Sequence, residues 1–403
     1  SALRAKVGQV KILTSGDLKR WFIDVDYKPP VSLTIVTPIV ADWLGGEKSV
    51  DLIHYMYPIA LVDYLPESSG KPSVTLVEPN PLSLPSFAPI VNEASDLAAV
   101  HLRLQNIRNH LVPDEFIPYA EEFVTLMVAG SYHCFPWEQH EVLEVQDRPM
   151  QKARNRQAVV QLEDYGRLHT NSFVKQEAYV ADKAPRNISN VMVKHNIELS
   201  RYTYPFKKEI LSKQHWYMPA RSMTEIAEAL QSFHRTHGPE LVETDFSKFD
   251  GTISRWLREN VEFRAYAAIF PEMLPLLRKE LDCVATTTTG YQYSADGSRL
   301  SGSPATTDGN TMIAAFVDYL ASRREGLSPE TAFAKIGLHF GDDGVSAPLP
   351  LLEETANLLG LKLKCLPKSQ FIGFLGRIYP DPSLSLGSFQ DPVRVWSRIT
   401  TLA

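Results

Sequence analysis

Cysteine is scarce in this sequence and is not arranged for cross-linking. The three cysteines, Cys134, Cys283 and Cys365, are far apart and form no Cys-x2-Cys pair, which argues against a disulfide framework and a zinc knuckle. His133 and His140 lie near Cys134, but the sequence offers no fourth zinc ligand close by. We therefore expect free thiols in a reducing compartment.

Several other signatures are missing. No stretch approaches the roughly 18 consecutive apolar residues that a membrane-spanning helix needs, and no signal-peptide pattern opens the chain, so we expect a soluble segment. No Gly-x4-Gly-Lys loop and no Gly-x-Gly-x2-Gly turn occurs, which removes support for a nucleoside triphosphatase of the common folds.

The net charge of −6 hides a basic region. Residues 151–221 contain thirteen Lys or Arg against six Asp or Glu. Such a concentration attracts phosphate groups through counterion release, although an ordinary solvated face is the simpler alternative. The length of 403 residues suits two or three lobes that share an interface.

Local patterns predict a few elements. Strands are expected at residues 286–289 and 291–293. Five apolar residues repeat at steps of three and four, which predicts an amphipathic helix: Leu97, Val100, Leu104, Ile107 and Leu111.

The most informative stretch is Gly341-Asp342-Asp343, which lies between an apolar run and Val345. The pattern predicts a strand, a tight turn and a second strand, with carboxylates at the tip. An Asp pair in a turn is commonly a solvated hairpin tip. Two carboxylates that both stay ionised, however, normally have cations nearby.

A second acidic cluster, residues 245–250, favours a metal site. Carboxylates without neighbouring thiols or clustered imidazoles suit hard cations such as Mg²⁺ or Mn²⁺. Residues 241–242 predict a short strand leading into Asp245, which would end that strand and be the third carboxylate. Asp250 lies about where a helix should begin, because four apolar residues follow at helical spacing. These are Ile253, Trp256, Leu257 and Val261.

Between the acidic clusters, a loop of small residues at 301–310 runs into the apolar segment 312–320. In isolation it is most simply a Ser/Thr cap before a helix. The three segments together match the patterns Asp-x4-Asp, Ser-Gly-x3-Thr-x3-Asn and Gly-Asp-Asp, in that order.

In this respect the chain resembles the palm of the RNA-dependent RNA polymerases of positive-strand RNA viruses, where these patterns are motifs A, B and C. The resemblance extends to motif F at residues 175–177 and 183–188, motif D at 360–369 and motif E at 374–377. It covers residues 170–380, and six motifs in order are far more specific than any one. Residues 249–253 and 300–304 are most similar to nodavirus replicases, with tombusvirus-like polymerases next.

The resemblance implies an α+β, right-hand polymerase with an antiparallel palm sheet flanked by helices, inserted fingers, and a thumb that is short or incomplete. Only 26 residues follow motif E, so the rest of the thumb would come from sequence outside this chain, a neighbouring molecule or the N-terminal extension. The implied domains are 1–150, an extension bridging to the fingers; 151–240, fingers with motif F; 241–270, palm with motif A; 271–300, a fingers insertion; 301–380, palm with motifs B to E; and 381–403, the start of a thumb or a tail.

The resemblance also implies catalytic roles. Asp245 and Asp342 would bind two Mg²⁺ ions, for which Mn²⁺ can substitute, and Asp343 would be an outer or occasional ligand. Lys368 would be the general acid that protonates the leaving pyrophosphate. Two other motif D lysines are alternatives: Lys362 and Lys364.

The implied nucleotide-binding residues form two groups. Lys175, Lys183 and Arg186 would neutralise the triphosphate from the fingers side. The second group would surround the nucleotide and contact its ribose 2′-hydroxyl: Asp250, Ser301, Thr306 and Asn310, with Gly302 beside them.

Outside both groups, Arg377 would help hold the primer end, although a structural ion pair is an equal alternative for it.

The implied function is template-directed RNA synthesis for viral genome replication, with an RNA template and product and ribonucleoside triphosphates as partners. A reverse transcriptase is the competing enzyme, but Asp250, Asn310 and Gly341 argue against it. A catalytically idle RNA-binding scaffold is the non-enzymatic alternative, although all three metal carboxylates are present.

The remaining expectations concern the setting in which the chain works. It would act beside other replicase domains or copies of itself, and would reach a host membrane only through parts outside this chain. Its place would be cytoplasmic, membrane-associated replication complexes, at the mitochondrial outer membrane for a nodavirus-like replicase. The first residue, Ser1, fits a portion excised from a larger replicase.

Overall fold

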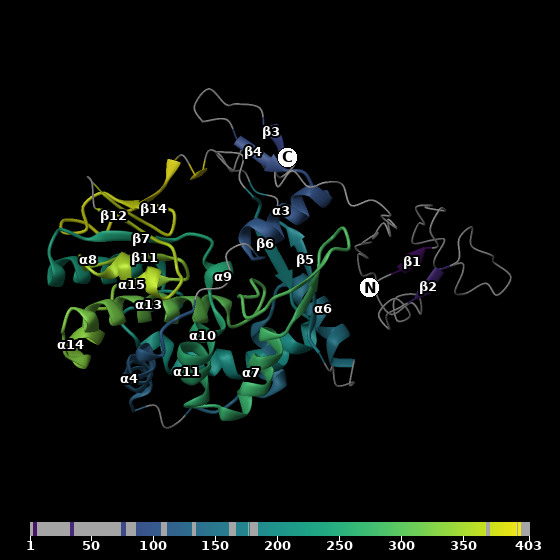
Figure 1. The fold of residues 1–403 in the computed structure, drawn as a ribbon, viewed down its shortest axis with the longest axis horizontal. Coiled ribbons are helices and arrows are strands. Elements are labelled where there is room, and N and C mark those ends of the chain that lie inside the picture. The colour runs from purple at the N-terminus through teal and green to yellow at the C-terminus, as the bar shows by residue number, and fades with distance from the viewer. Residues whose placement is uncertain are drawn as a thin grey trace.

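A computed structural model describes residues 3–5, 33–35, 74–77, 86–105, 111–130, 134–160, 167–175, 177, 184–367, 371–392 and 394–395. These residues form helices together with small, mostly antiparallel sheets (Figure 1), which confirms the α+β class. In the N-terminal region, strand β1 (Leu3–Ala5) pairs with β2 (Leu33–Ile35), and β3 (Val74–Val77) pairs with β4 (Ser86–Pro89).

Helix α3 (Glu93–Arg103) follows these strands. Asn92 caps it by accepting a hydrogen bond from the Ser95 N–H at 3.0 Å, and Leu97 and Val100 are buried. The apolar spacing predicts a helix as far as Leu111, and this is wrong: the helix ends at Arg103, and Leu111 is 93% exposed. Ile107, another residue of this predicted stretch, lies outside the described residues.

A four-stranded antiparallel sheet has the order β10-β11-β7-β12. Its strands are β7 (Val242–Phe246), β10 (Leu338–Phe340), β11 (Asp343–Ser346) and β12 (Leu363–Pro367). Residues Thr244 and Phe246 of β7 are buried whereas Asp245 between them is exposed, as the period of two in a strand requires. The acidic residue therefore leaves the sheet on the face opposite to its buried neighbours.

A second sheet has the order β6-β5-β8-β9. It joins β5 (His169–Val174) and β6 (Asn187–Asn190) to β8 (Val284–Thr286) and β9 (Gln292–Ser294), with β5 and β8 parallel. The strand predicted at 286–289 lies earlier than expected, because Thr287 to Gly290 form the turn that leads to β9. A third sheet contains β13 (Ile372–Phe374), β14 (Arg377–Tyr379) and β15 (Phe389–Gln390).

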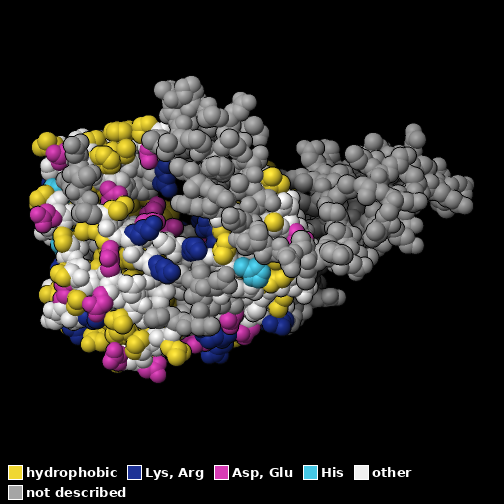
Figure 2. Space-filling model, turned by 45° about the horizontal axis from the view of Figure 1, so that its top comes forward, with side chains coloured by type: hydrophobic (Ala, Val, Ile, Leu, Met, Phe, Trp, Pro, Cys, Tyr) yellow, Lys and Arg dark blue, Asp and Glu magenta, His cyan; other side chains and the backbone are white. Residues whose placement is uncertain are grey.

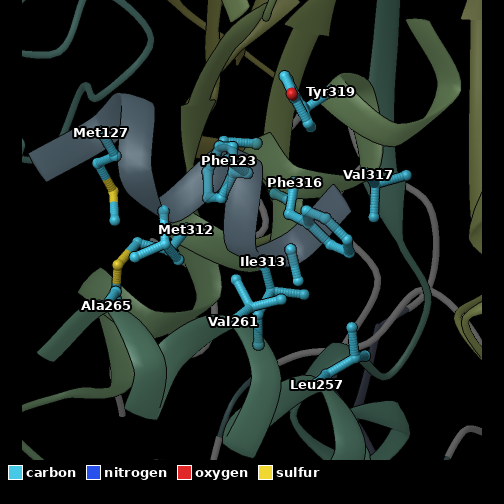
Figure 3. Close-up of a cluster of buried hydrophobic side chains, with 14 of the residues drawn as sticks. Phe123, Met127, Leu257, Val261, Ala265, Met312, Ile313, Phe316, Val317 and Tyr319 are labelled. Atoms are coloured by element: carbon cyan, nitrogen blue, oxygen red, sulfur yellow. The ribbon is translucent and has the colours of Figure 1, made fainter. Parts of the chain in front are cut away.

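Helix α13 (Thr306–Arg324) lies at the centre of the largest core. Residues from Asp308 to Ser322 are all buried, so the helix is enclosed on every side, as a central helix should be. Figure 3 shows its residues Ile313 and Phe316 against Phe123 of α4 (Ile117–Val128) and Val261 of a π-helical turn (Arg258–Phe263). This packing fixes the helix that carries Asn310.

The other helices surround this core and the two larger sheets. None of the described helices is both long and apolar enough to cross a membrane. They are α5 (Gln139–Val145), α6 (Pro149–Val160), α7 (Val193–Glu209), α8 (Met223–His237), α9 (Phe249–Thr252), α10 (Arg255–Leu257), α11 (Arg264–Ala267), α12 (Leu274–Leu281), α14 (Pro329–Ala334) and α15 (Leu352–Leu358), with 3₁₀ turns at Asp114–Phe116, Leu211–Lys213 and Pro271–Met273.

Candidate active site

The hairpin of β10 and β11 places two predicted carboxylates beside each other. Asp343 pairs in register with Asp245 of β7, and the N–H of Phe246 donates to the carbonyl oxygen of Asp342 at 3.4 Å. Residues directly opposite each other on antiparallel strands have side chains on the same face. The strand–turn–strand prediction is therefore confirmed, and the turn brings its acidic residues to the end of β7.

Gly341 allows the turn to form. Its φ of +65° lies in the left-handed region, which residues with a Cβ disfavour. Its N–H donates to Thr311 Oγ1 at 2.9 Å, so the hairpin tip is tied to α13. The acidic turn and the helix that bears Asn310 are thus held in a fixed relation.

The carboxylates disfavour one another's charge. Burial and then the charge of Asp342 raise the pKa of Asp343 to about 6. Partial loss of hydration and then Asp342 also raise the pKa of Asp245, although Lys364 and Arg394 act in the opposite direction. The site therefore carries more negative charge than its neighbours balance.

These carboxylates fit a divalent cation. Within the described parts of the chain, no three His, Cys, Asp or Glu side chains converge closely enough to hold a metal ion by themselves. Magnesium, however, is commonly held by one or two carboxylates, with water and substrate phosphates completing its ligands. Asp245 and Asp343 lie directly opposite each other on neighbouring strands, so that their carboxylates share one face of the sheet and can both serve as such ligands.

The raised pKa of Asp343 predicts a stability cost. The pKa is about 6 in the folded chain and about 3.9 in an unfolded one, so ionisation destabilises the fold increasingly as pH rises from about 4 to above 6. Without divalent cations, Asp343→Asn should therefore raise the free energy of unfolding by about 1–3 kcal/mol at about pH 8 and by almost nothing at about pH 4. Urea unfolding of both proteins across this range measures the difference, and a gain independent of pH would contradict the prediction.

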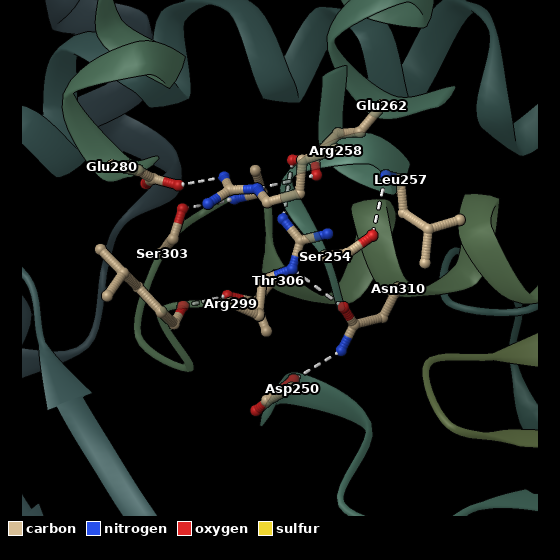
Figure 4. A network of polar contacts seen from close by, with 12 residues as sticks. Asp250, Ser254, Leu257, Arg258, Glu262, Glu280, Arg299, Ser303, Thr306 and Asn310 are labelled. Carbon is tan, nitrogen blue, oxygen red and sulfur yellow. Dashed lines mark hydrogen bonds and ion pairs between the residues drawn. The ribbon is translucent and has the colours of Figure 1, made fainter. Parts of the chain in front are cut away.

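Two predicted ribose-contacting residues meet directly. Asn310 Nδ2 donates to Asp250 Oδ1 at 2.8 Å, and Asn310 Oδ1 accepts from Arg299 Nε at 2.9 Å (Figure 4). Burial raises the pKa of Asp250, whereas the bond from Asn310 and the charge of Arg299 oppose that shift. A largely enclosed carboxylate with one oxygen bonded to Asn310 can accept a further hydrogen bond from a hydroxyl group.

The remaining members of that predicted set contact the main chain. Ser301 Oγ accepts from the Ser189 N–H at 2.9 Å, and Thr306 Oγ1 donates to the Leu300 carbonyl at 2.6 Å. A Cβ added at Gly302 would lie 2.0 Å from the Ser189 carbonyl oxygen, so the loop lies directly against β6. The structure thus brings Asp250 and Asn310 together but uses these hydroxyls to hold the loop.

The alternative that this loop caps a helix is wrong. The residue that precedes α13 is Ala305, and no side chain caps the helix there. Asn310 lies inside the helix, where its side chain bonds to Asp250 and Arg299 instead of to the helix backbone. Its contacts therefore extend outward from the helix.

The basic residues of the predicted motif F lie between β5 and β6. The Lys175 N–H donates to the Arg186 carbonyl at 2.8 Å, and Glu177 forms ion pairs with Lys175 at 2.8 Å and Arg186 at 3.9 Å. The charge of Arg186 also opposes the rise in the pKa values of Asp250 and Asp343, so this residue acts on the acidic centre. Lys183 lies outside the described residues.

The predicted motif D contacts the acidic centre through Lys364, whereas Arg377 of motif E contacts the segment before β15. Lys364 of β12 pairs in register with Asp245, and its charge opposes the rise in the pKa of that carboxyl. Lys368 lies outside the described residues. Arg377 donates from Nε to Ser388 Oγ at 2.9 Å and from NH2 to the Ser388 carbonyl at 2.8 Å, contacts that join β14 to the segment before β15.

Sequence patterns missed several contributors. Arg299 and Arg394 act on the acidic residues, but neither belongs to a recognised motif. The C-terminal end of α3 also holds two motif segments: Lys248 Nζ donates to the Leu102 carbonyl at 2.7 Å, and Arg103 Nε donates to the Ala184 carbonyl at 2.7 Å. Only Arg299, which lies two residues before Ser301, had a signal nearby in the sequence.

Charged side chains gather on one face of the molecule. Figure 2 shows Lys and Arg side chains around a hollow in which acidic side chains are also visible. A surface of this kind can attract a polyanion to its rim while the acidic floor accepts cations.

Comparison with known proteins gives a consistent result. The family model described as viral RNA-dependent RNA polymerase matches residues 137–359. Proteins named RNA-directed RNA polymerase are similar to this chain at 38% identity in striped jack nervous necrosis virus, 32% in Macrobrachium rosenbergii nodavirus and 30% in Flock house virus. The matches cover 86%, 74% and 75% of this chain and 37%, 30% and 32% of those relatives, so the chain spans about a third of their length.

Proposed function

The chain belongs to the viral RNA-dependent RNA polymerase family, and we propose that it is a nucleotidyltransferase that copies an RNA template from ribonucleoside triphosphates during viral genome replication. Its similarity to nodavirus replicases, which the motifs predict, is confirmed. The observation that carries the proposal is the pairing of Asp245 with Asp343 beside the linked pair Asp250 and Asn310. Together these supply carboxylates for a cation and polar groups for a sugar.

We also propose the right-hand arrangement of domains. The sheet β10-β11-β7-β12 fits the palm, with 241–270 and 301–380 as its two sequence segments. Strands β5 and β6 from 151–240 share a sheet with β8 and β9 from 271–300, which supports grouping both segments as fingers. The helix α3 in 1–150 contacts both groups, which supports a bridging role for the extension.

The remaining residues, 381–403, would begin a thumb or form a tail, with the rest of the thumb supplied by other replicase domains or by copies of this chain. The third sheet supports that idea because large apolar side chains on and around it are exposed. These are Leu366, Phe371, Leu384, Leu386 and Phe389. Any membrane-associated replication site in the host cytoplasm would be reached through parts outside this chain.

In the proposed mechanism, Asp245 and Asp342 would hold two Mg²⁺ or Mn²⁺ ions, with Asp343 as an occasional ligand. When bound, such ions supply charge stabilisation for phosphoryl transfer. Lys175 and Arg186 now form ion pairs with Glu177. They would release Glu177 and bind the incoming triphosphate in its place, because phosphate oxygens are stronger partners for paired cations than one carboxylate.

The leaving pyrophosphate requires a proton donor. Lys364 is in register with Asp245, which makes it a donor candidate beside the sequence-based candidate Lys368. Single-turnover rates of Lys364→Leu and Lys368→Leu would distinguish the two lysines.

A direct assay separates this function from its alternatives. The purified chain would be given RNA or DNA templates with ribonucleotides or 2′-deoxynucleotides and Mg²⁺. We expect incorporation of ribonucleotides on RNA. Preference for deoxynucleotides would instead indicate a reverse transcriptase, and RNA binding without incorporation would indicate a scaffold.

Ribose selection provides a specific prediction. A site that hydrogen-bonds a hydroxyl rejects the analogue that lacks it, by about 10⁴-fold in favourable cases. Asn310→Ala should therefore lower kcat/KM for ribonucleotides more than for 2′-deoxynucleotides, and narrow their ratio by at least about tenfold. If both values fall by the same factor, Asn310 has no part in recognising the sugar.

A further inference from the structure

Arg299 is an unusual neighbour for the sugar-contacting pair because its side chain is fully enclosed, at 0% exposure. Its Nε donates to Asn310 Oδ1 at 2.9 Å, and its NH1 donates to Glu262 Oε1 at 2.7 Å. Its backbone N–H donates to the carbonyl of Asp250 at 3.0 Å. The same residue thus contacts the side chain of one member of the pair and the main chain of the other.

These contacts decide which way the Asn310 amide faces. A guanidinium group only donates hydrogen bonds, so the amide oxygen of Asn310 must face Arg299. The amide nitrogen then faces Asp250, where it donates at 2.8 Å. An amide rotated by 180° would set its NH₂ group against the guanidinium and its oxygen against a carboxylate.

The guanidinium is itself held from two sides. Glu262 also accepts from Arg258 Nε at 3.3 Å, and Arg258 NH2 donates to Glu280 at 2.7 Å, with all of these side chains fully buried (Figure 4). On the other side, a Cβ added at Gly309 would lie 2.5 Å from Arg299 NH2. The absence of a side chain at this position of α13 therefore makes room for the guanidinium.

We propose that Arg299 is a positioning residue for sugar selection, which it serves by fixing the Asn310 amide in the orientation that bonds Asp250. The proposal rests on the polymerase function proposed above. Arg299 itself would not touch the nucleotide. It sets the direction of the Asn310 amide, so that Asp250 keeps an oxygen free for the 2′-hydroxyl group.

The test compares two buried arginines of the same cluster. Arg299→Lys keeps a positive charge near Glu262 but loses the forked donor geometry. Arg258→Lys makes the same change at an equally buried position that has no contact with Asn310. For Arg299→Lys we expect the ratio of kcat/KM for ribonucleotides to that for 2′-deoxynucleotides to fall about fivefold to tenfold. Arg258→Lys should change this ratio far less, because Arg258 reaches Arg299 only through Glu262.

A double substitution tests whether the effect passes through Asn310. In an Asn310→Ala background, Arg299→Lys should change the ratio no further, because the amide that it orients is gone. A further fall would overturn the proposal, and so would an unchanged ratio for Arg299→Lys in the wild-type background. If the wild-type chain incorporates no nucleotide on RNA, the proposed function itself fails and this inference fails with it.

A second variant serves if Arg299→Lys does not fold. Arg299→Met combined with Glu262→Gln removes both charges together and retains an acceptor for Arg258, which avoids an unpaired buried carboxylate. The same fivefold to tenfold fall in the sugar ratio is expected. A wild-type ratio in this folded double variant would equally overturn the proposal.

Discussion

Asp342→Asn is expected to abolish nucleotide incorporation, with a loss of about 10³-fold or more in rate, because ligation of a catalytic cation contributes several kcal/mol to transition-state stabilisation. Asp342 is exposed at the tip of the hairpin, and its charge raises the pKa values of Asp245 and Asp343. The substitution preserves shape and leaves no cavity. The fold and RNA affinity should therefore stay close to wild type.

Single-turnover incorporation, thermal unfolding and RNA binding should be measured on the same preparations. Asp147→Asn is a matched control because Asp147 is also exposed but lies in the segment between α5 and α6. The control should retain wild-type incorporation. Wild-type turnover by Asp342→Asn would remove this residue from the metal site.

Gly302→Ala is expected to have the second largest effect, because the new Cβ would lie 2.0 Å from the Ser189 carbonyl oxygen. Backbone atoms must move by more than 1 Å to relieve such a contact, and overpacking typically costs about 1–3 kcal/mol. The shift would also break the bond from the Ser189 N–H to Ser301 Oγ. We expect a loss of about 3 kcal/mol in stability together with a large fall in incorporation.

Gly130→Ala is the comparison for this prediction. A Cβ at Gly130 meets no atom within 4 Å, although its φ of +77° makes any side chain mildly unfavourable. Its cost should stay near 1 kcal/mol, without a specific effect on incorporation. Equal losses for the two variants would mean that the contact between the loop and β6 is unimportant.

The sequence predicts the acidic centre well because local spacing and chain order specify it. The turn at Gly341 and the strand before Asp245 both follow from short-range patterns, and antiparallel pairing then brings Asp343 beside Asp245. The preference of hard cations such as Mg²⁺ for oxygen ligands adds a reason to expect carboxylates at this centre. The turn and the strand required no knowledge of distant contacts, whereas the meeting of Asp245 with Asp343 was expected from the order of the motifs.

Distant contacts explain what the sequence could not show. The side chain of Arg299 joins Asn310 to Glu262, and these partners lie 11 and 37 residues away along the chain. Likewise, the apolar repeat that ends at Leu111 continues past the helix, because apolar spacing alone does not show at which residue a helix ends. The use of the Ser301 and Thr306 hydroxyls by the main chain was also invisible in the motif.

The most direct test of RNA-templated RNA synthesis is incorporation of one nucleotide opposite a defined templating base. Four RNA primer–template duplexes that differ only at that base would be mixed with all four ribonucleoside triphosphates, Mg²⁺ and the purified chain. We expect that the added ribonucleotide changes with the templating base and is always its complement, and that addition is lost in Asp342→Asn. Addition of the same nucleotide to all four duplexes, or no addition to any, would contradict it.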